Sequence, residues 1–383
     1  MSPSKAADKR LRIAVLNRHF GKRFGGAEHY SVAIAEQLAQ RHEVHVFAQE
    51  IEHPMVGLQA HRISRPLRKP RWFNQLWYAA ATWWHTRTGF DAVLSHENTW
   101  HGQIQTIHVR PFKTGLFHQR TGWRKALKWL ALATSPRLLT YWWLEKARMR
   151  PDAHRAIVAT SSAVRQEILQ AYPAAAPLLH TITPGVALPT IPPDKTGMRE
   201  RLGLPSAAPV ALFVGNDYLK KGLPTLLRAL TQLPLLHLAV AGNTTHLGTC
   251  QQQAQSLGIA DRVHFLGALA DMALAYQAAD FLVHPTTEDT YAMVVVEAMA
   301  HGLPVIVSGP RHCGVAAELV HQQDALLLDD PQDADALRGL IAQLHSSPDL
   351  ANRLAQAGRH FASQRSWAAA AAQYEVLALA CQG

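Results

Sequence analysis

Residues 280–307 read DFLVHPTTEDTYAMVVVEAMAHGLPVIV and place two short apolar runs on either side of a polar loop and a helical segment. The runs 280–283 and 304–307 are predicted to be buried strands. A helix is predicted to begin near Tyr291 and to end at His301-Gly302, with Gly302 as the first residue beyond it. Strand, loop, helix and strand in this order form the repeating unit of a parallel α/β sheet.

Two carboxylates, Asp289 and Glu297, bracket the loop and the first turns of this helix. Helix N-terminal amides attract phosphate, and carboxylates accept hydrogen bonds from sugar hydroxyls. The segment therefore predicts a site for a phosphorylated, polyhydroxylated ligand. The alternative is an ordinary amphipathic helix with a solvated acidic start.

The same residues closely resemble the donor-site signature of retaining glycosyltransferases of family 4. That signature has an acidic residue, seven intervening residues and a Glu, followed by Ala-Met/Ala-x-Gly-x-Pro-Val. Asp289 takes the first acidic position and Glu297 the second, whereas Glu288 is one residue out of register and remains the alternative. Two departures are visible, since the first acid is usually Glu and Ala292 stands where the family usually has Gly.

The resemblance implies a role for each of these positions. Glu297 would bind the ribose hydroxyls of a nucleotide sugar, and Asp289 the hydroxyls of the transferred sugar. The diphosphate would be neutralised by backbone amides of Ala292, Met293 and Val294. Both acids, with His108 from the other half of the chain, are the candidate catalytic residues.

A second segment, residues 213–222, reads FVGNDYLKKG. A strand is expected to end at Gly215, and Lys221 precedes the start of a helix, where a cation beside free amides suits a diphosphate. The segment resembles the family's Gly-Arg…Lys-Gly loop, but Asn216 replaces the Arg. Lys220 is the candidate for the missing cationic contact, and a solvated loop is the alternative.

Candidate ligand contacts also occur in the first half of the chain. Gly25-Gly26 follows the first predicted strand and lets a ligand approach the start of a helix closely. His96 and His108 each follow a predicted strand, and ligand sites in open α/β sheets lie at such strand ends. By resemblance, the glycine loop faces the donor phosphates and the acceptor, and His108 contacts the donor sugar or the acceptor.

The alternation of apolar strands and helices predicts two α/β domains, each a doubly wound, Rossmann-like sheet. Proline-rich residues 184–193 mark a hinge between them. The expected division is an acceptor-binding domain over residues 1–187 and a nucleotide-sugar-binding domain over 188–366, with a C-terminal helix over 367–383 packing back on the first. The resemblance adds that the two domains face a central cleft, the GT-B architecture.

Charge is unevenly distributed along the 383 residues, whose formal net charge is +10. Residues 1–187 carry 26 Lys and Arg against 11 Asp and Glu, and they hold nine of the ten tryptophans. Interleaved Trp and basic residues are typical of an anionic membrane surface. A second interpretation is that the basic residues bind an acidic soluble acceptor. Stacking of the tryptophans on single-stranded nucleic acid is disfavoured. The plain alternative is that the tryptophans only fill a core.

Taken with these features, the resemblance implies a retaining hexosyltransferase that uses a nucleotide sugar, with a UDP-sugar as the expected donor and no other cofactor. The acceptor would be a glycolipid or phosphorylated saccharide, since the chain resembles lipopolysaccharide-core glucosyltransferases. Without an Asp-x-Asp motif, no metal is expected. The chain shows no signal sequence and no long apolar run, and its three cysteines are scattered. We therefore expect a cytoplasmic protein that is peripheral to the inner face of the membrane. A sugar-nucleotide epimerase and a non-catalytic membrane scaffold are the alternatives.

Overall fold

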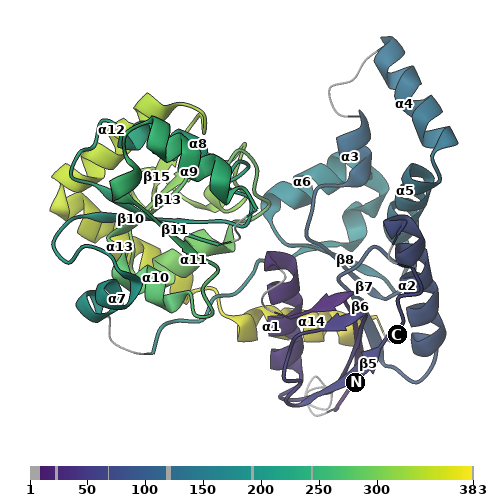
Figure 1. Cartoon of the computed structure of the whole chain (residues 1–383). Coiled ribbons are helices and arrows are strands. Elements are labelled where there is room, and N and C mark those ends of the chain that lie inside the picture. The colour runs from purple at the N-terminus through teal and green to yellow at the C-terminus, as the bar shows by residue number, and fades with distance from the viewer. Residues whose placement is uncertain are drawn as a thin grey trace. The chain divides into compact units, whose positions relative to one another are not determined.

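The computed structural model describes residues 9–21, 25–67, 69–117, 122–190, 194–242 and 245–381. The chain forms two compact units (Figure 1), one of Met1–Gly185 with Trp367–Gly383 and the other of Val186–Ser366. Each is built on a parallel sheet with helices on both faces, so the predicted α/β class is confirmed. Within the described residues, no helix is long and apolar enough to cross a membrane.

Seven strands of the described chain form the sheet of the first unit. Five of them follow the apolar runs predicted from the sequence, whereas the two edge strands were missed because they are short or largely polar. The order is β5 (Leu58–Arg62), β3 (Glu43–Ala48), β1 (Arg12–Leu16), β6 (Ala92–Ser95), β7 (Ile104–Ile107), β8 (Ala156–Ala159) and β9 (Leu179–Thr181). A separate short pair joins β2 (His19–Phe20) to β4 (Glu50–Ile51).

Helices α1 (Gly26–Leu38) and α14 (Trp367–Ala380) pack together on one face of this sheet. Tyr374 of α14 is fully buried, and its hydroxyl lies 3.1 Å from that of Tyr30 and 2.8 Å from Oγ1 of Thr106. The C-terminal helix is therefore part of the first unit. Helices α2 (Arg71–Thr86) and α6 (Ser162–Ala171) cover the other face.

Three further helices, α3 (Phe112–Phe117), α4 (Gly122–Thr134) and α5 (Pro136–Arg148), connect β7 to β8. Ser135 lies between α4 and α5, and its hydroxyl accepts a hydrogen bond from the amide of Leu138 at 3.4 Å. Figure 1 shows α4 and α5 extending from the body of their unit.

Six strands of the described chain form the second sheet, all parallel. Their order along the sheet is that of a dinucleotide-binding fold, and it reverses direction between β10 and β13. Ligands bind such sheets at that point, outside the carboxyl ends of the strands. The order is β12 (Val263–Gly267), β11 (His237–Ala241), β10 (Val210–Val214), β13 (Phe281–His284), β14 (Val305–Ser308) and β15 (Leu326–Leu328).

Helices cover both faces of the second sheet because alternate strand residues point to opposite sides. Leu212 and Leu282 pack with α7 (Lys195–Leu202), α10 (Ala273–Ala278) and α11 (Met293–Ala300). Phe213 and Val283 pack with α8 (Leu223–Leu230), α9 (Leu247–Ser256) and α12 (Ala334–Ser346). Helix α13 (Pro348–Ser363) contributes to both clusters.

Candidate functional site

The loops that follow β10 and β13 lie against each other at the switch point of the second sheet. The carbonyl oxygen of Lys220 accepts hydrogen bonds from the amide of Thr287 at 3.0 Å and from its hydroxyl at 2.9 Å. Gly222, with φ of +83°, makes this approach possible, because a Cβ there would lie 1.8 Å from the carbonyl oxygen of Pro285. The two segments singled out in the sequence therefore form one site.

Asp289 is the most heavily bonded side chain of this site. Its Oδ2 lies 2.6 Å from Nζ of Lys221 and 3.2 Å from Nε2 of His284. Its Oδ1 accepts hydrogen bonds from the amides of Tyr291 at 3.2 Å and Ala292 at 2.8 Å. Asp289 thus joins the cationic loop to the segment that starts α11.

The protonation of Asp289 is set by opposing effects. Burial favours the neutral acid, but the hydrogen bond from His284 and the Lys221 ammonium outweigh it, so the pKa of Asp289 lies well below its usual value. The carboxylate stays ionised at neutral pH. It is therefore an acceptor of hydrogen bonds and not a proton donor.

Glu288, the alternative first acid, has a different environment. Its side chain is 39% exposed and pairs with Lys220 at 3.0 Å, whereas the side chain of Asp289 is 15% exposed. Lys220, the candidate replacement for the arginine missing at Asn216, is therefore held by Glu288 in this structure. Its contact with a diphosphate remains a prediction.

Helix α11 begins two residues later than the sequence predicted, and the reason is Ala292. This residue has φ of +67° and ψ of +67°, a left-handed conformation that cannot continue a right-handed helix. The helix starts at Met293, and the amides of Met293 and Val294 in its first turn have no acceptor within the helix. Free amides at a helix start favour phosphate, and phosphate binding by these two remains a prediction.

The other end of α11 lies where it was predicted, with His301 as its cap and Gly302 directly beyond it. The helix ends at Ala300, followed by Gly302 with φ of +74°. The amide of Gly302 donates to the carbonyl of Met299 at 2.8 Å, and that of Leu303 to the carbonyl of Ala298 at 3.0 Å. These two bonds form the Schellman motif expected of a glycine in this position.

Glu297 lies one turn beyond Met293 on α11 and is half-buried. Its Oε2 accepts a hydrogen bond from the hydroxyl of Tyr276 at 2.7 Å. Burial, together with the charge of Glu297, raises the pKa of Tyr276 well above its ordinary value, so the phenol remains a donor. The Tyr276 ring stacks on His301 with centroids 5.1 Å apart.

Sequence reasoning missed three residues of this site. Tyr276 and His284 hold the two acids, and Nδ1 of His312 lies 3.0 Å from the carbonyl oxygen of Thr287. His284 ends β13 directly before the loop, so its position was a usable signal. Tyr276 and His312 come from segments with no recognisable motif, and only the fold brings them here.

Gly215 and Lys221 are close neighbours in the cationic loop. The amide of Gly215 donates to the carbonyl of Ala241 at 3.0 Å. A Cβ at Gly215 would lie 2.9 Å from Cγ of Lys221, so glycine lets the lysine side chain pass over the end of β10. That path directs the ammonium group to Asp289.

The candidates of the first unit lie at the carboxyl ends of its strands. Nδ1 of His96 is 3.0 Å from Nε2 of His108, and the ring of Tyr30 packs edge-on against His108 with centroids 5.1 Å apart. Burial and the nearby Arg148 guanidinium lower the pKa of His108 to about 3, which keeps it neutral at pH 7. The structure thus brings together the two histidines predicted from separate strands.

Gly25 and Gly26 form the start of α1, with Gly25 as its N-terminal cap and Gly26 as its first residue. Gly26 is exposed, and no atom would lie within 4 Å of a Cβ built on it. Neighbouring residues 22–24 fall outside the described part of the chain. The contact of this glycine pair with a ligand remains a prediction.

No cluster of three or more His, Cys, Asp or Glu suited to a metal ion occurs among the described residues. Lys221 and, on the exposed side, Lys220 bring positive charge to the site of the second unit.

Two family models match the two halves of the chain. Residues 24–188 match the model described as Glycosyltransferase Family 4, and residues 194–361 match that of Glycosyl transferases group 1. Each half of the chain is thus similar to a glycosyltransferase family model. The second match contains the whole site around Lys221, Asp289 and Glu297.

Curated relatives are named D-inositol 3-phosphate glycosyltransferase. That of Xylanimonas cellulosilytica is 32% identical over 245 residues, which cover 60% of this chain and 58% of the relative. That of Catenulispora acidiphila is 32% identical over 240 residues, covering 58% of this chain and 55% of the relative. The chain therefore matches somewhat more than half the length of these relatives.

Solved structures with the same fold are glycosyltransferases of the GT-B type. WaaG, described as a glycosyltransferase involved in lipopolysaccharide biosynthesis, superposes with a TM-score of 0.81 at 19% identity, covering 95% of this chain and 98% of that one. Sucrose-phosphate synthase of Thermosynechococcus elongatus gives a TM-score of 0.76 at 24% identity, covering 96% and 98%. Anabaena HepE in complex with UDP-glucose gives 0.74 at 20% identity, covering 95% and 98%.

Proposed function

We propose that this chain, whose two halves match glycosyltransferase families, is a retaining, metal-independent hexosyltransferase with a nucleotide sugar as donor. The grouping of Lys221, Asp289, Glu297 and the start of α11 at one sheet edge carries the proposal. The cationic helix start suits the diphosphate of a nucleotide sugar, and the carboxylates suit its sugar hydroxyls. A UDP-sugar is the expected donor, and the UDP-glucose bound by HepE supports that choice.

Each group has a role in this proposal. Oε1 of Glu297 accepts hydrogen bonds from the ribose, since Tyr276 occupies Oε2. Asp289 accepts them from the transferred sugar, with Lys221 between it and the diphosphate. The amides of Met293 and Val294 complete the diphosphate site.

The reaction replaces one bond at the anomeric carbon. The acceptor oxygen attacks this carbon from the face that the diphosphate leaves, the carbon–oxygen bond to the diphosphate breaks, and the acceptor proton passes to the departing oxygen. The diphosphate takes the electron pair and gains negative charge. Lys221 and the α11 amides stabilise that charge, which is an electrostatic form of catalysis that requires no metal.

The acceptor we propose is a phosphorylated saccharide or a glycolipid of the cell envelope, as in lipopolysaccharide core synthesis. Residues 112–150 of the first unit carry nine Lys and Arg and a single acidic residue, a charge that favours phosphorylated partners. The relatives named for D-inositol 3-phosphate support an acceptor with a phosphate group.

We further propose that the first unit binds the anionic inner face of the cytoplasmic membrane. None of the nine tryptophans of residues 1–187 is buried, so the interpretation that they fill the core is wrong. Six of them are 41–68% exposed. They lie on three helices: Trp77, Trp83 and Trp84 on α2, Trp123 and Trp129 on α4, and Trp143 on α5. Trp and basic side chains together favour the headgroup region.

Glu297→Ala tests the proposed transfer reaction. With radiolabelled UDP-sugars and envelope glycan acceptors, we expect the variant to lose at least 100-fold in transfer rate while its thermal midpoint stays unchanged (roughly 3 kcal/mol of lost interaction). Glu200→Ala, on the exposed side of α7, is the matched control and should transfer normally. Near-normal turnover by Glu297→Ala would exclude this donor site. Conversion of the donor without any acceptor would instead identify an epimerase.

Membrane binding is tested separately by co-sedimentation with vesicles. The wild-type protein should pellet with phosphatidylglycerol vesicles and remain in solution with phosphatidylcholine vesicles. Leu130→Ser removes a side chain of α4 that is 62% exposed, and Leu235→Ser removes one of the second unit that is 72% exposed. Only the first should weaken binding. Equal loss in both, or no binding by the wild type, would exclude the α4 surface.

A further inference from the structure

The first unit contains a pocket of about 1510 Å³ that none of the predicted site residues lines. It lies at the amino ends of β7, β8 and β9, because Trp100 precedes β7, residues 149–155 precede β8 and residues 171–174 precede β9. His96 and His108 follow the carboxyl ends of parallel strands and so belong to the opposite edge of the sheet. The pocket is therefore separate from the candidate contacts of the first unit.

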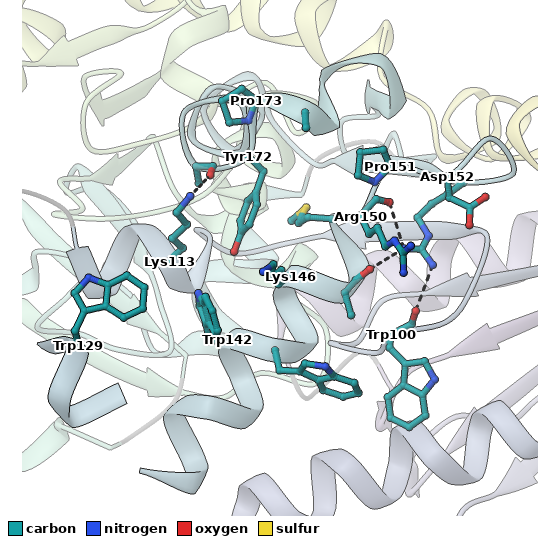
Figure 2. Close-up of a pocket in the computed structure, with 16 residues that line it drawn as sticks. Trp100, Lys113, Trp129, Trp142, Lys146, Arg150, Pro151, Asp152, Tyr172 and Pro173 are labelled. Carbon is teal, nitrogen blue, oxygen red and sulfur yellow. Dashed lines mark hydrogen bonds between the residues drawn. The ribbon is translucent and has the colours of Figure 1, made fainter. Parts of the chain in front are cut away.

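Five aromatic side chains line the pocket, namely Trp100, Trp129, Trp142, Trp143 and Tyr172 (Figure 2). Trp129 and Trp142 meet edge-on with centroids 6.1 Å apart, and Trp100 and Trp143 lie 5.6 Å apart. Tyr172 is held in place by its hydrogen bond to Glu145 at 2.7 Å. Rigid rings of this kind offer apolar contact at little cost in conformational entropy.

The charge of the lining is strongly positive, with Lys113, Lys146, Arg150 and Arg155 against the single acid Asp152. Two of these cations donate hydrogen bonds to backbone carbonyl groups. Arg155 donates to the carbonyl oxygens of Ala147 at 2.8 Å and Trp100 at 3.3 Å, and Lys113 donates to that of Ala171 (Figure 2).

Lys146 and Arg150 are the other two cations of the lining. Both are exposed, and neither forms an ion pair with any residue that the structure describes. Nζ of Lys146 lies 5.4 Å from the ring centroid of Trp142, so a cation borders the aromatic wall directly. An anion bound here would contact ammonium and guanidinium groups beside an apolar surface.

Exposed apolar side chains lie on the same helices as these walls. Trp123, Leu127 and Leu130 of α4 are 52–68% exposed, and Leu139 of α5 is 40% exposed. A soluble anion would leave the aromatic walls unused, and a hydrocarbon would leave the cations unused. The occupant that satisfies both is an amphiphile with an anionic head.

We propose that this pocket binds a single anionic phospholipid, with its phosphate between Lys146 and Arg150 and its hydrocarbon along Trp129 and Trp142. The pocket is larger than the 300–1,000 Å³ typical of small-molecule sites, which suits a ligand of this size. Such a site differs from contact with a membrane plane, because one lipid molecule is enclosed. It is also separate from the proposed donor contacts, since none of them lines the pocket.

The test uses short-chain lipids below the concentration at which they aggregate, so that no membrane surface exists. Calorimetric titration of the full chain with dihexanoyl-phosphatidylglycerol should show saturable binding of one molecule. Dihexanoyl-phosphatidylcholine and glycerol 3-phosphate should each bind at least tenfold more weakly. Diheptanoyl-phosphatidylglycerol should bind about fourfold more tightly if one additional methylene becomes buried.

Variants locate the site. Lys146→Glu with Arg150→Glu should weaken binding of the anionic lipid at least tenfold. Arg62→Glu, at an exposed cation on strand β5 at the other edge of the sheet, makes the same kind of charge reversal at one position and should bind as the wild type does. UDP affinity should be unchanged in all three proteins, which separates this site from the donor site.

Three results would overturn the proposal. The first is equal binding of glycerol 3-phosphate and the lipid, which would indicate a simple anion site. The second is equal lipid affinity of the double variant and the wild type. The third is the absence of saturable binding of any lipid by the wild type. Each can occur whether or not the protein transfers sugars.

Discussion

Nζ of Lys221 lies 2.6 Å from Oδ2 of Asp289, so a cation from the loop after β10 and an acid from the loop after β13 form one pair. The pair spans the switch point of the sheet. Its two members were predicted to contact different parts of one donor, the diphosphate and the transferred sugar. Their direct contact means that both parts of the ligand would meet at this point.

Lys221→Ala is expected to weaken UDP binding. A hydrogen bond to a charged group contributes about 1.5–3 kcal/mol, so the loss should be roughly 10- to 150-fold in calorimetric affinity. Lys195→Ala is the matched control, since Lys195 pairs with Asp280 at 2.8 Å in the same unit. Unchanged UDP affinity in Lys221→Ala would show that this cation does not contact the diphosphate.

Tyr276→Phe should raise the donor KM more than it lowers kcat. The phenol holds one oxygen of Glu297, so its loss frees the carboxylate to rotate while leaving Lys221 and Asp289 in place. We expect KM to rise about 5- to 10-fold, the equivalent of roughly 1–1.4 kcal/mol. Steady-state kinetics at varied donor concentration would measure both constants. A fall in kcat at constant KM would contradict a role in positioning the ribose contact.

Ala292→Gly should stabilise the protein. Alanine in the left-handed region costs about 1–2 kcal/mol of folding free energy, which glycine would avoid. Glycine also gives the unfolded chain more conformational freedom, and this offsets about 0.4–1 kcal/mol of the stabilisation. The net effect of somewhat under 1 kcal/mol should raise the thermal midpoint by about 1–4 °C. Ala342→Gly, within α12, should lower it. A lower midpoint for Ala292→Gly would show that the strain is absent.

Acid should destabilise the first unit through its buried histidines. Burial lowers the pKa of His108 to about 3 and that of His101 to about 4, from an ordinary value of 6.5. Between about pH 3 and pH 6.5 the unfolded state therefore binds more protons than the folded state. The contribution of these histidines to the free energy of unfolding is fully present above pH 6.5 and falls progressively towards pH 3. His108→Gln should reduce the loss of thermal midpoint between pH 7.5 and about 4.5. The exposed His154→Gln should leave it unchanged, and identical profiles for wild type and His108→Gln would refute the assignment.

Local sequence predicted much of the fold because its signals are local. Strands β13 and β14 lie within one residue of the predicted runs 280–283 and 304–307, and α14 begins at Trp367 as predicted. Edge strands β5 and β9 gave no such signal, since an edge strand buries few of its side chains. The start of α11 was misplaced because a pattern of residue types does not reveal the left-handed backbone at Ala292.

The sequence by itself determined the class of fold and the two acids of the site, because period, spacing and residue type are written along the chain. Only the tertiary structure decided that Lys221 meets Asp289 and that Tyr276 holds Glu297, since these partners are separated by 68 and 21 residues. The same is true of the aromatic pocket, whose walls come from three separate connections between strands. Such contacts depend on which strands are neighbours in a sheet, and that order follows from packing the whole chain.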